Sequence, residues 1–215
     1  MTVLDYVSII HGALATVSIS LVSIALGVPL GLGLALIRWS RLPFLNQLTA
    51  AYVSIARTCP SVTLALLIFF ALPEVGISLD PIPAGVLTLT LSTAAFNTEI
   101  WRNALMNFPP DQYDAALSFG MRRYTRFRRV VLPQIVHSAL PALVNEMTLL
   151  VKASPAVAVI GIVEITRAAI RVGARTYDPL PPFIFALLIY SLLVFVFVKT
   201  QRVVERRYAQ AGAPA

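Results

Sequence analysis

The chain has 215 residues, of which 58% are hydrophobic and 13% charged, and its net charge is +7. Soluble domains carry about 25% charged residues, so this composition excludes an ordinary soluble domain. An excess of Lys and Arg in a membrane protein usually marks its cytoplasmic loops, and we therefore expect no nucleic-acid partner. The lone Cys59 excludes an internal disulfide.

Long uncharged stretches predict an integral, all-α membrane protein. No Asp, Glu, Lys or Arg occurs from Tyr6 to Ile37 or from Pro179 to Val198. A helix that crosses a bilayer needs about 20 such residues. The first stretch lacks the basic leading segment and the short apolar core of a secretory signal. We expect one transmembrane domain over residues 1–215, embedded in a lipid bilayer.

The apolar segments predict five transmembrane helices. In chain order, they cover approximately residues 12–37, 48–72, 82–106, 134–153 and 182–198. In the first span, Gly27 and Gly31 form a small-residue face that lets another helix approach closely. The second span is interrupted by Arg57 and Pro60, which need to face protein or a water-filled cavity.

Charged residues in or beside the predicted spans are candidates for the translocation path, because intramembrane charge is usually functional. The candidates are Arg57, Glu99, Glu146, Lys152 and Glu164. Arg57 also suits a structural role near Pro60. Glu99 also suits a packing pair with Arg102, three residues on. Glu146 and Lys152 lie six residues apart, on different helical faces, so we do not expect them to pair.

The distribution of basic residues predicts the orientation in the membrane. Twelve of the 17 Lys and Arg residues gather on one side: Arg38, Arg41, the arginines from 102 to 129 and the tail at about 199–215. This bias places the C-terminus and the 107–133 loop in the cytoplasm and the N-terminus outside. Arg167, Arg171 and Arg175 fall on the other side and share one helical face. They either line an outer vestibule or lie along the interface.

The longest polar interruption covers about residues 107–133. Two prolines, then Asp111, then the pair Ala115-Ala116 predict a short helix, which Gly120 ends. Leu132-Pro133 marks the return to the membrane. A short helix across the membrane surface is suited to insertion into a partner's groove, where apolar anchors give affinity and charges give register.

The chain lacks the motifs of several enzyme classes. No lysine sits in a phosphate-binding Gly-Lys-Ser/Thr loop, so ATP-driven transport requires a separate ATPase subunit. No Gly-x-Ser-x-Gly elbow occurs. His11, His137 and Cys59 show no metal-ligand spacing. We therefore expect none of these catalytic centres in the chain.

The loop carries a resemblance to a known family. Asp114-Ala115-Ala116, Gly120, Val130 and Leu132-Pro133 keep the spacing of the Glu-Ala-Ala loop of ABC importer permeases, with Asp for Glu and Val for Ile. Within that group, the chain resembles the polar amino-acid uptake permeases related to the histidine and glutamine systems. Further similar stretches are Ala51–Pro60, Glu99–Arg102, Pro109–Ala116 and Asn145-Glu146 with Lys152. The similarity ends at Ala153–Ala156, which replace four residues usual in the family.

The resemblance implies a type I ABC importer core in the bacterial cytoplasmic (inner) membrane. Its expected partners are an ABC ATPase subunit dimer, a second permease copy or paralogue, and an extracytoplasmic solute-binding protein. ATP and Mg would be bound by the ATPase, and no cofactor by this chain. The implied ATPase-coupling residues are Asp111, Gln112, Asp114, Ala115, Ala116, Gly120, Leu132 and Pro133.

The resemblance further implies uptake of a polar amino acid or related zwitterion by alternating access. Opines and compatible solutes stay open as substrates. An alternative from another class is a stand-alone ion-coupled carrier or channel, although the inverted repeats common in such carriers are not evident. A third alternative is a membrane scaffold that transports nothing, which leaves the charges inside the spans unexplained.

Overall fold

The computed structural model describes residues 1–40 and 42–211. Arg41, which was counted for the predicted orientation, lies outside the described residues. So do residues 212–215, the end of the predicted basic tail. Every regular element in the described part is helical, which confirms the predicted all-α class. The α-helices are α1 (Val3–Trp39), α2 (Pro43–Thr58), α3 (Ser61–Ala71), α4 (Pro81–Met106), α5 (Pro110–Ser118), α6 (Arg123–Arg126), α7 (Leu132–Ala153), α8 (Ile165–Thr176) and α9 (Leu180–Ala211).

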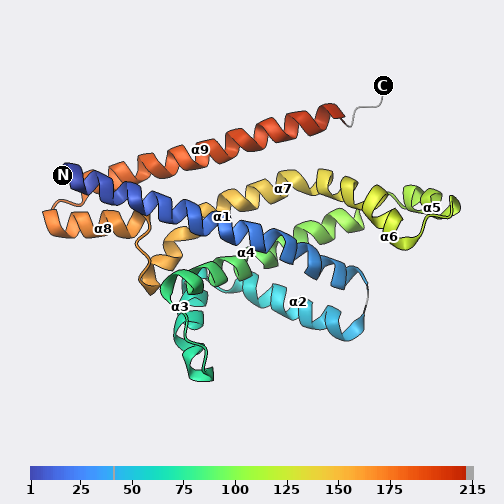
Figure 1. Cartoon of the computed structure of the whole chain (residues 1–215), viewed down its shortest axis with the longest axis horizontal. Helices are drawn as coiled ribbons and strands as arrows, with labels where there is room; N and C mark the ends of the chain where they lie inside the picture. Colours follow the sequence, from blue (N-terminus) through green and yellow to red (C-terminus); the bar gives the residue numbers. More distant parts are fainter. Residues whose placement is uncertain (41, 212–215) are drawn as a thin grey trace.

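Three shorter helical turns connect these helices. They are the 3₁₀ helices η1 (Pro73–Val75) and η3 (Ser154–Ile160) and the π-helix η2 (Phe127–Val131). In Figure 1, α1, α4, α7 and α9 run along the long axis of the molecule, and α3 projects away from it. The start of α1 and α8 lie at one end, whereas α5, α6 and the end of α9 lie at the other.

Within the described residues, length and composition identify three helical segments able to cross a membrane: Val3–Trp39, Arg123–Ile160 and Leu180–Thr200. The bent pair of α2 and α3 raises the number to four if it counts as one span. The prediction of five spans is therefore only partly supported. The helix that does not qualify is α4, because Thr88, Thr93, Asn97 and Thr98 lower its average hydropathy. These polar side chains are all buried inside the molecule.

The second span is interrupted near Pro60, as predicted. Its two halves, α2 and α3, meet at a bend of 113°. The last backbone bond of α2 runs from the Cys59 N–H to the Ile55 carbonyl at 2.9 Å. Cys59 then adopts an extended conformation with ψ 127°, as the residue before a proline prefers. Pro60 has no N–H to continue the ladder, so a new helix begins at Ser61.

Close contact between α1 and α4 forms the centre of the molecule. A Cβ placed on Gly27 would lie 2.2 Å from a methyl group of Thr93, and one on Gly31 would lie 3.0 Å from the Thr98 backbone nitrogen. The predicted small-residue face is thus confirmed, with α4 as its partner. The indole N–H of Trp101 on α4 donates to the Val28 carbonyl of α1 at 3.1 Å.

An apolar cluster joins these helices to the α5 end of the molecule. Its buried members come from α1, α4, η2 and α7 and include Ala35, Trp101, Val131 and Ile135. Partly buried side chains that pack on it include Tyr113 of α5 and Phe127 of η2. This packing connects α5 directly to the membrane helices.

Candidate functional site

The α5 helix has well-formed ends. Pro110 occupies its first turn together with Asp111, where a proline and an acid are both favoured. At its end, the Gly120 N–H donates to the Leu117 carbonyl at 2.9 Å and the Met121 N–H donates to the Ala116 carbonyl at 3.2 Å. This is a Schellman ending, which needs a residue with positive φ, and Gly120 has φ +69°. The predicted short helix ending at Gly120 is confirmed.

A buried arginine holds α5 in place. Arg126 of α6 is only 7% exposed, and its guanidinium lies 4.3 Å from the centre of the Tyr113 ring. Arg126 donates to the Tyr113 hydroxyl at 2.8 Å and to the Met121 carbonyl at 3.2 Å. A second tie runs from the Gln134 amide of α7 to the Gln112 amide oxygen of α5. The side chains of α5 thus rest on the segment that follows it.

The outer face of α5 carries charge and bare apolar groups together. Asp111, Gln112, Asp114 and Ala115 are exposed, whereas Ala116 is buried against the protein. Two apolar side chains are also exposed, Leu117 by 54% and Phe119 by 88%. A phenylalanine so exposed at the tip of a polar loop is suited to fill a partner's pocket.

Leu132 and Pro133 lie at the start of α7, directly after the π-helical segment η2. Pro133 has no N–H and therefore cannot complete the α-helical bond to the Arg129 carbonyl, and the register shifts in this turn. Leu132 is partly buried and packs on the cluster that holds Trp101, while Pro133 is exposed. Both residues follow the tip of the loop in the sequence and lie at the start of the helix to which the loop connects.

Within the membrane helices, three of the predicted charged residues lie around α4: Arg57, Glu99 and Glu146. Glu146 of α7 is buried, and the Thr93 hydroxyl of α4 and the Arg57 guanidinium both act on its carboxylate electrostatically. Arg57 is exposed at the end of α2, with its guanidinium 5.3 Å from the centre of the Phe96 ring. Beside Thr93, the fully buried Asn97 donates to the Thr93 hydroxyl at 3.3 Å, while its own side-chain oxygen has no hydrogen-bond partner in the described structure.

Glu99 forms an ion-pair network nearer the α5 end. It pairs with Arg102 of its own helix at 2.7 Å, as its spacing predicted, and with Arg38 at the end of α1. Arg57 also acts on Glu99 electrostatically. Since the α1 partner is far away in sequence, only the structure shows that Glu99 ties two helices together.

Lys152 and Glu164 lie apart from this group. Lys152 is exposed near the end of α7. Glu164 is fully buried and caps α8, where it accepts the N–H groups of Thr166 at 2.9 Å and Arg167 at 2.7 Å. The Tyr190 hydroxyl of α9 donates to the same carboxylate at 2.7 Å. With its oxygens so occupied, Glu164 has the geometry of a structural anchor between α8 and α9.

The sequence profile of the binding-protein-dependent transport system inner membrane component family matches residues 27–210. The chain belongs to this family. The arginine transport system permease protein ArtQ of Bacillus subtilis is 35% identical over 200 residues, covering 93% of this chain and 91% of ArtQ. The histidine/lysine/arginine/ornithine transport system permease protein HisQ of Salmonella typhimurium is 31% identical, covering 94% and 93%.

The fold agrees with this assignment. A crystal structure of an amino acid ABC transporter with histidines contains a chain that superposes with a TM-score of 0.86 at 31% identity, covering 96% of this chain and 100% of that chain. The resemblance of the Asp114–Pro133 loop to that of ABC importer permeases is thereby confirmed as a family relationship. The protein is a multi-pass inner-membrane permease of an ABC importer of the polar amino acid type, and a transport subunit rather than an enzyme.

The side chains that hold the permease loop in place were not found from the sequence. Tyr113 and Arg126 lie 13 residues apart in a run with four other arginines, and nothing in that run distinguishes the one that turns inward. Within the described residues, no group of three or more His, Cys, Asp or Glu side chains is arranged to hold a metal ion.

Proposed function

We propose that this permease carries a zwitterionic polar amino acid past Glu146 and Arg57. The observation that carries the proposal is the buried Glu146 carboxylate, with the Thr93 hydroxyl and the Arg57 guanidinium around it. A negative and a positive group at one place complement the ammonium and carboxylate of an amino acid. ArtQ and HisQ, by their names, transport arginine and a set of amino acids that includes histidine, so we propose a polar amino acid as the substrate.

Five transmembrane crossings fit the helices if α4 and the bent α2–α3 pair are included. With 26 residues, α4 is about 39 Å long at 1.5 Å per residue, more than the hydrocarbon core of about 30 Å. Its buried threonines and Asn97 face α1 and α7 rather than lipid. A polar helix surrounded by other helices costs little in a membrane, so its composition does not prevent a crossing.

A second permease copy or paralogue fits the open face of α7. Asn145 and Lys152 are exposed on this helix, seven residues apart and therefore on one face. Exposure of either side chain to the hydrocarbon of the bilayer would be energetically unfavourable. A facing permease, with a water-filled path between the two, provides the polar surroundings that they require. In this proposed arrangement, the translocation path runs between the two subunits.

The exposed tip of the loop fits a separate ATPase subunit. Leu117 and Phe119 supply apolar anchors, and Asp111 and Asp114 supply flanking charge. The ATPase would bind ATP and Mg, since this chain has no phosphate-binding loop. An extracytoplasmic solute-binding protein would deliver the amino acid to the opposite end.

The described ends of the molecule support the proposed orientation. The start of α1 lies at the α8 end, and α9 runs from there toward the end of the molecule that carries α5 (Figure 1). With α5 at a cytoplasmic ATPase, the N-terminus lies outside and the C-terminus inside. In a Cys59→Ser background, a membrane-impermeant maleimide should label Tyr177→Cys in intact cells and Tyr124→Cys only after permeabilisation. The reverse pattern would refute the orientation.

The function is tested by uptake in proteoliposomes that contain the permease with its ATPase and its solute-binding protein. We expect ATP-dependent accumulation of at least one labelled polar amino acid or opine. Glu146→Gln should lower that uptake about tenfold, because a neutral amide replaces a charge-assisted bond. The matched control is Glu74→Gln in the exposed turn η1. Uptake that needs no ATPase would favour a stand-alone carrier, and normal uptake by Glu146→Gln would reject the proposed path.

A further inference from the structure

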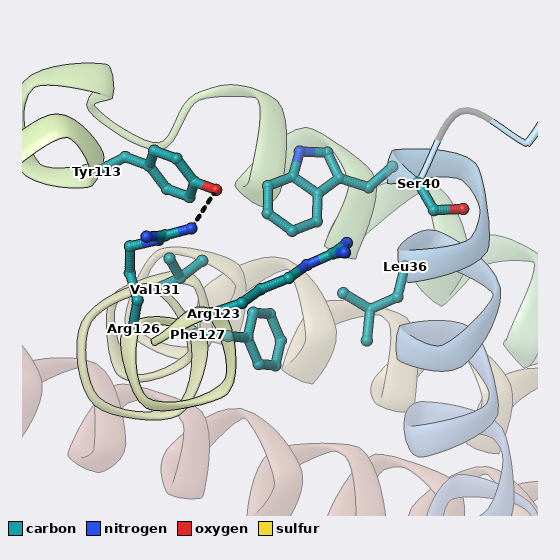
Figure 2. A pocket seen from close by; sticks show the side chains of 8 residues that line it. Leu36, Ser40, Tyr113, Arg123, Arg126, Phe127 and Val131 are labelled. Carbon is teal, nitrogen blue, oxygen red and sulfur yellow. Dashed lines mark hydrogen bonds between the residues drawn. The ribbon is translucent and has the colours of Figure 1, made fainter. Parts of the chain in front are cut away.

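A cavity of about 410 Å³ lies beside the segment that supports α5 (Figure 2). It opens between the last turn of α1 and the α5–η2 region. Its lining combines basic, aromatic and aliphatic side chains: Leu36, Trp39, Ser40, Tyr113, Arg123, Arg126, Phe127 and Val131. The transport mechanism proposed above makes no use of it.

The cavity is rich in positive charge that the described residues do not neutralise. Their ion pairs join Glu99 to Arg38 and Arg102, and Asp5 to Arg175, so none involves the arginines between positions 122 and 129. In Figure 2, Arg126 turns to Tyr113, whereas Arg123 extends across the cavity toward Leu36 of α1 and Ser40, the residue after α1. Arg123 is therefore available to an anion that enters from outside.

The cavity lies where the headgroups of a bilayer are expected. The 37 residues of α1 form a helix about 55 Å long at 1.5 Å per residue, which exceeds the hydrocarbon core of about 30 Å. The C-terminal end of α1 consequently extends into the interfacial region. Trp39, 39% exposed at that end, is the residue type most typical of this region, and Arg38 precedes it.

An apolar face leads along α1 to the cavity. Val22, Pro29 and Leu36 are spaced by seven residues and therefore lie on one side of the helix. Val22 and Pro29 are exposed, and Leu36 lines the cavity together with Phe127 and Val131. A hydrocarbon chain lying against this face would end at the arginines.

We propose that this cavity binds the headgroup of an anionic glycerophospholipid of the cytoplasmic leaflet. The phosphodiester pairs with Arg123, and an acyl chain lies along the Val22–Leu36 face of α1. Basic pockets between membrane helices on the cytoplasmic side suit such headgroups, and the cytoplasmic leaflet is the anionic one. The inference depends on the orientation proposed above but requires neither the substrate nor ATP hydrolysis.

The test measures lipid binding to the permease–ATPase complex in phosphatidylcholine nanodiscs. A minor share of the lipid is phosphatidylglycerol or phosphatidylcholine with brominated acyl chains, which quench nearby tryptophan fluorescence. We expect stronger quenching by the phosphatidylglycerol. Trp39→Phe should remove this difference, because Trp101 is buried. Arg123→Gln should weaken the phosphatidylglycerol preference about fivefold. The matched control is Arg129→Gln, an exposed arginine of the same segment that does not line the cavity.

Each other outcome overturns the proposal in a distinct way. Equal quenching by the two lipids would show that the cavity does not select an anionic headgroup. Equal effects of Arg123→Gln and Arg129→Gln would show that the preference arises from general surface charge and not from this cavity. Displacement of the phosphatidylglycerol preference by inorganic phosphate would assign the cavity to a soluble anion. If the phosphatidylglycerol preference is present in the permease alone and absent in the complex, the cavity is a contact site for the ATPase and not for lipid. None of these results depends on amino-acid uptake, so the function proposed above is tested separately.

Discussion

Two buried carboxylates of this permease differ in what surrounds them. Glu164 accepts two backbone N–H groups of α8 and the Tyr190 hydroxyl of α9, so its negative charge is satisfied by fixed donors. Glu146 has Thr93 and the exposed Arg57 around it, a setting that a mobile ligand can enter. Both residues were candidates for the path from sequence alone, since an isolated acid in an apolar run gives no sign of its partners. The geometry gives Glu164 the contacts of an anchor, and we propose Glu146 as the path residue.

Tyr190→Phe tests the anchor role. The change removes the 2.7 Å bond to Glu164 from a partly buried site. We expect the free energy of unfolding to fall by about 1–3 kcal/mol, the usual cost of an unsatisfied buried acceptor. The measurement is the thermal unfolding midpoint in detergent, compared with Tyr177→Phe, a control at an exposed tyrosine. Uptake per folded molecule should stay normal, and its loss at unchanged stability would make this cluster part of the path instead.

At the scale of elements, the α1–α4 pair was predictable in part. The spacing of Gly27 and Gly31 predicted a close helix contact, but the identity of the partner came from the structure. The α5 helix was predictable because its proline, acid and glycine act locally. The interruption at Arg57 and Pro60 was predictable, but the 113° bend between α2 and α3 was not, because a bend angle depends on how the two halves pack. The tie from Arg126 to Tyr113 was missed because it depends on three-dimensional packing.

Gly31→Ala tests the α1–α4 contact. The new methyl group would lie 2.7 Å from the Asn97 Cβ and 3.0 Å from the Thr98 backbone nitrogen, so a helix must move. We expect a loss of about 1–3 kcal/mol in stability, as for other overpacked sites. Gly33→Ala on the same helix is the matched control, since its Cβ meets nothing within 4 Å. Equal thermal midpoints for the two variants would contradict the assigned packing.

At the scale of the whole molecule, the structure links the loop to the membrane helices through packed side chains. Tyr113 of α5 and Phe127 of η2 pack on the cluster that contains Ala35 of α1, Trp101 of α4 and Ile135 of α7. A partner that moves α5 therefore pushes on three membrane helices at once. The same α1 and α4 helices carry the Arg38–Glu99 pair, which lies between the loop and the Glu146 region. This continuity is the route by which we propose that ATPase closure reaches the path.

The central claim is that α5 transmits the work of an ATPase, and Gly120→Asp tests it most directly. Gly120 has φ +69° and no neighbour for an added Cβ, so the change strains the end of α5 without a clash. Gly76→Asp is the matched control, with φ +84° and open space, in the turn that follows α3. The measurement is ATP hydrolysis by the reconstituted complex, stimulated by the loaded binding protein. We predict that Gly120→Asp loses the stimulation while remaining in the membrane, and that Gly76→Asp keeps it. Unchanged stimulation in Gly120→Asp would contradict the account.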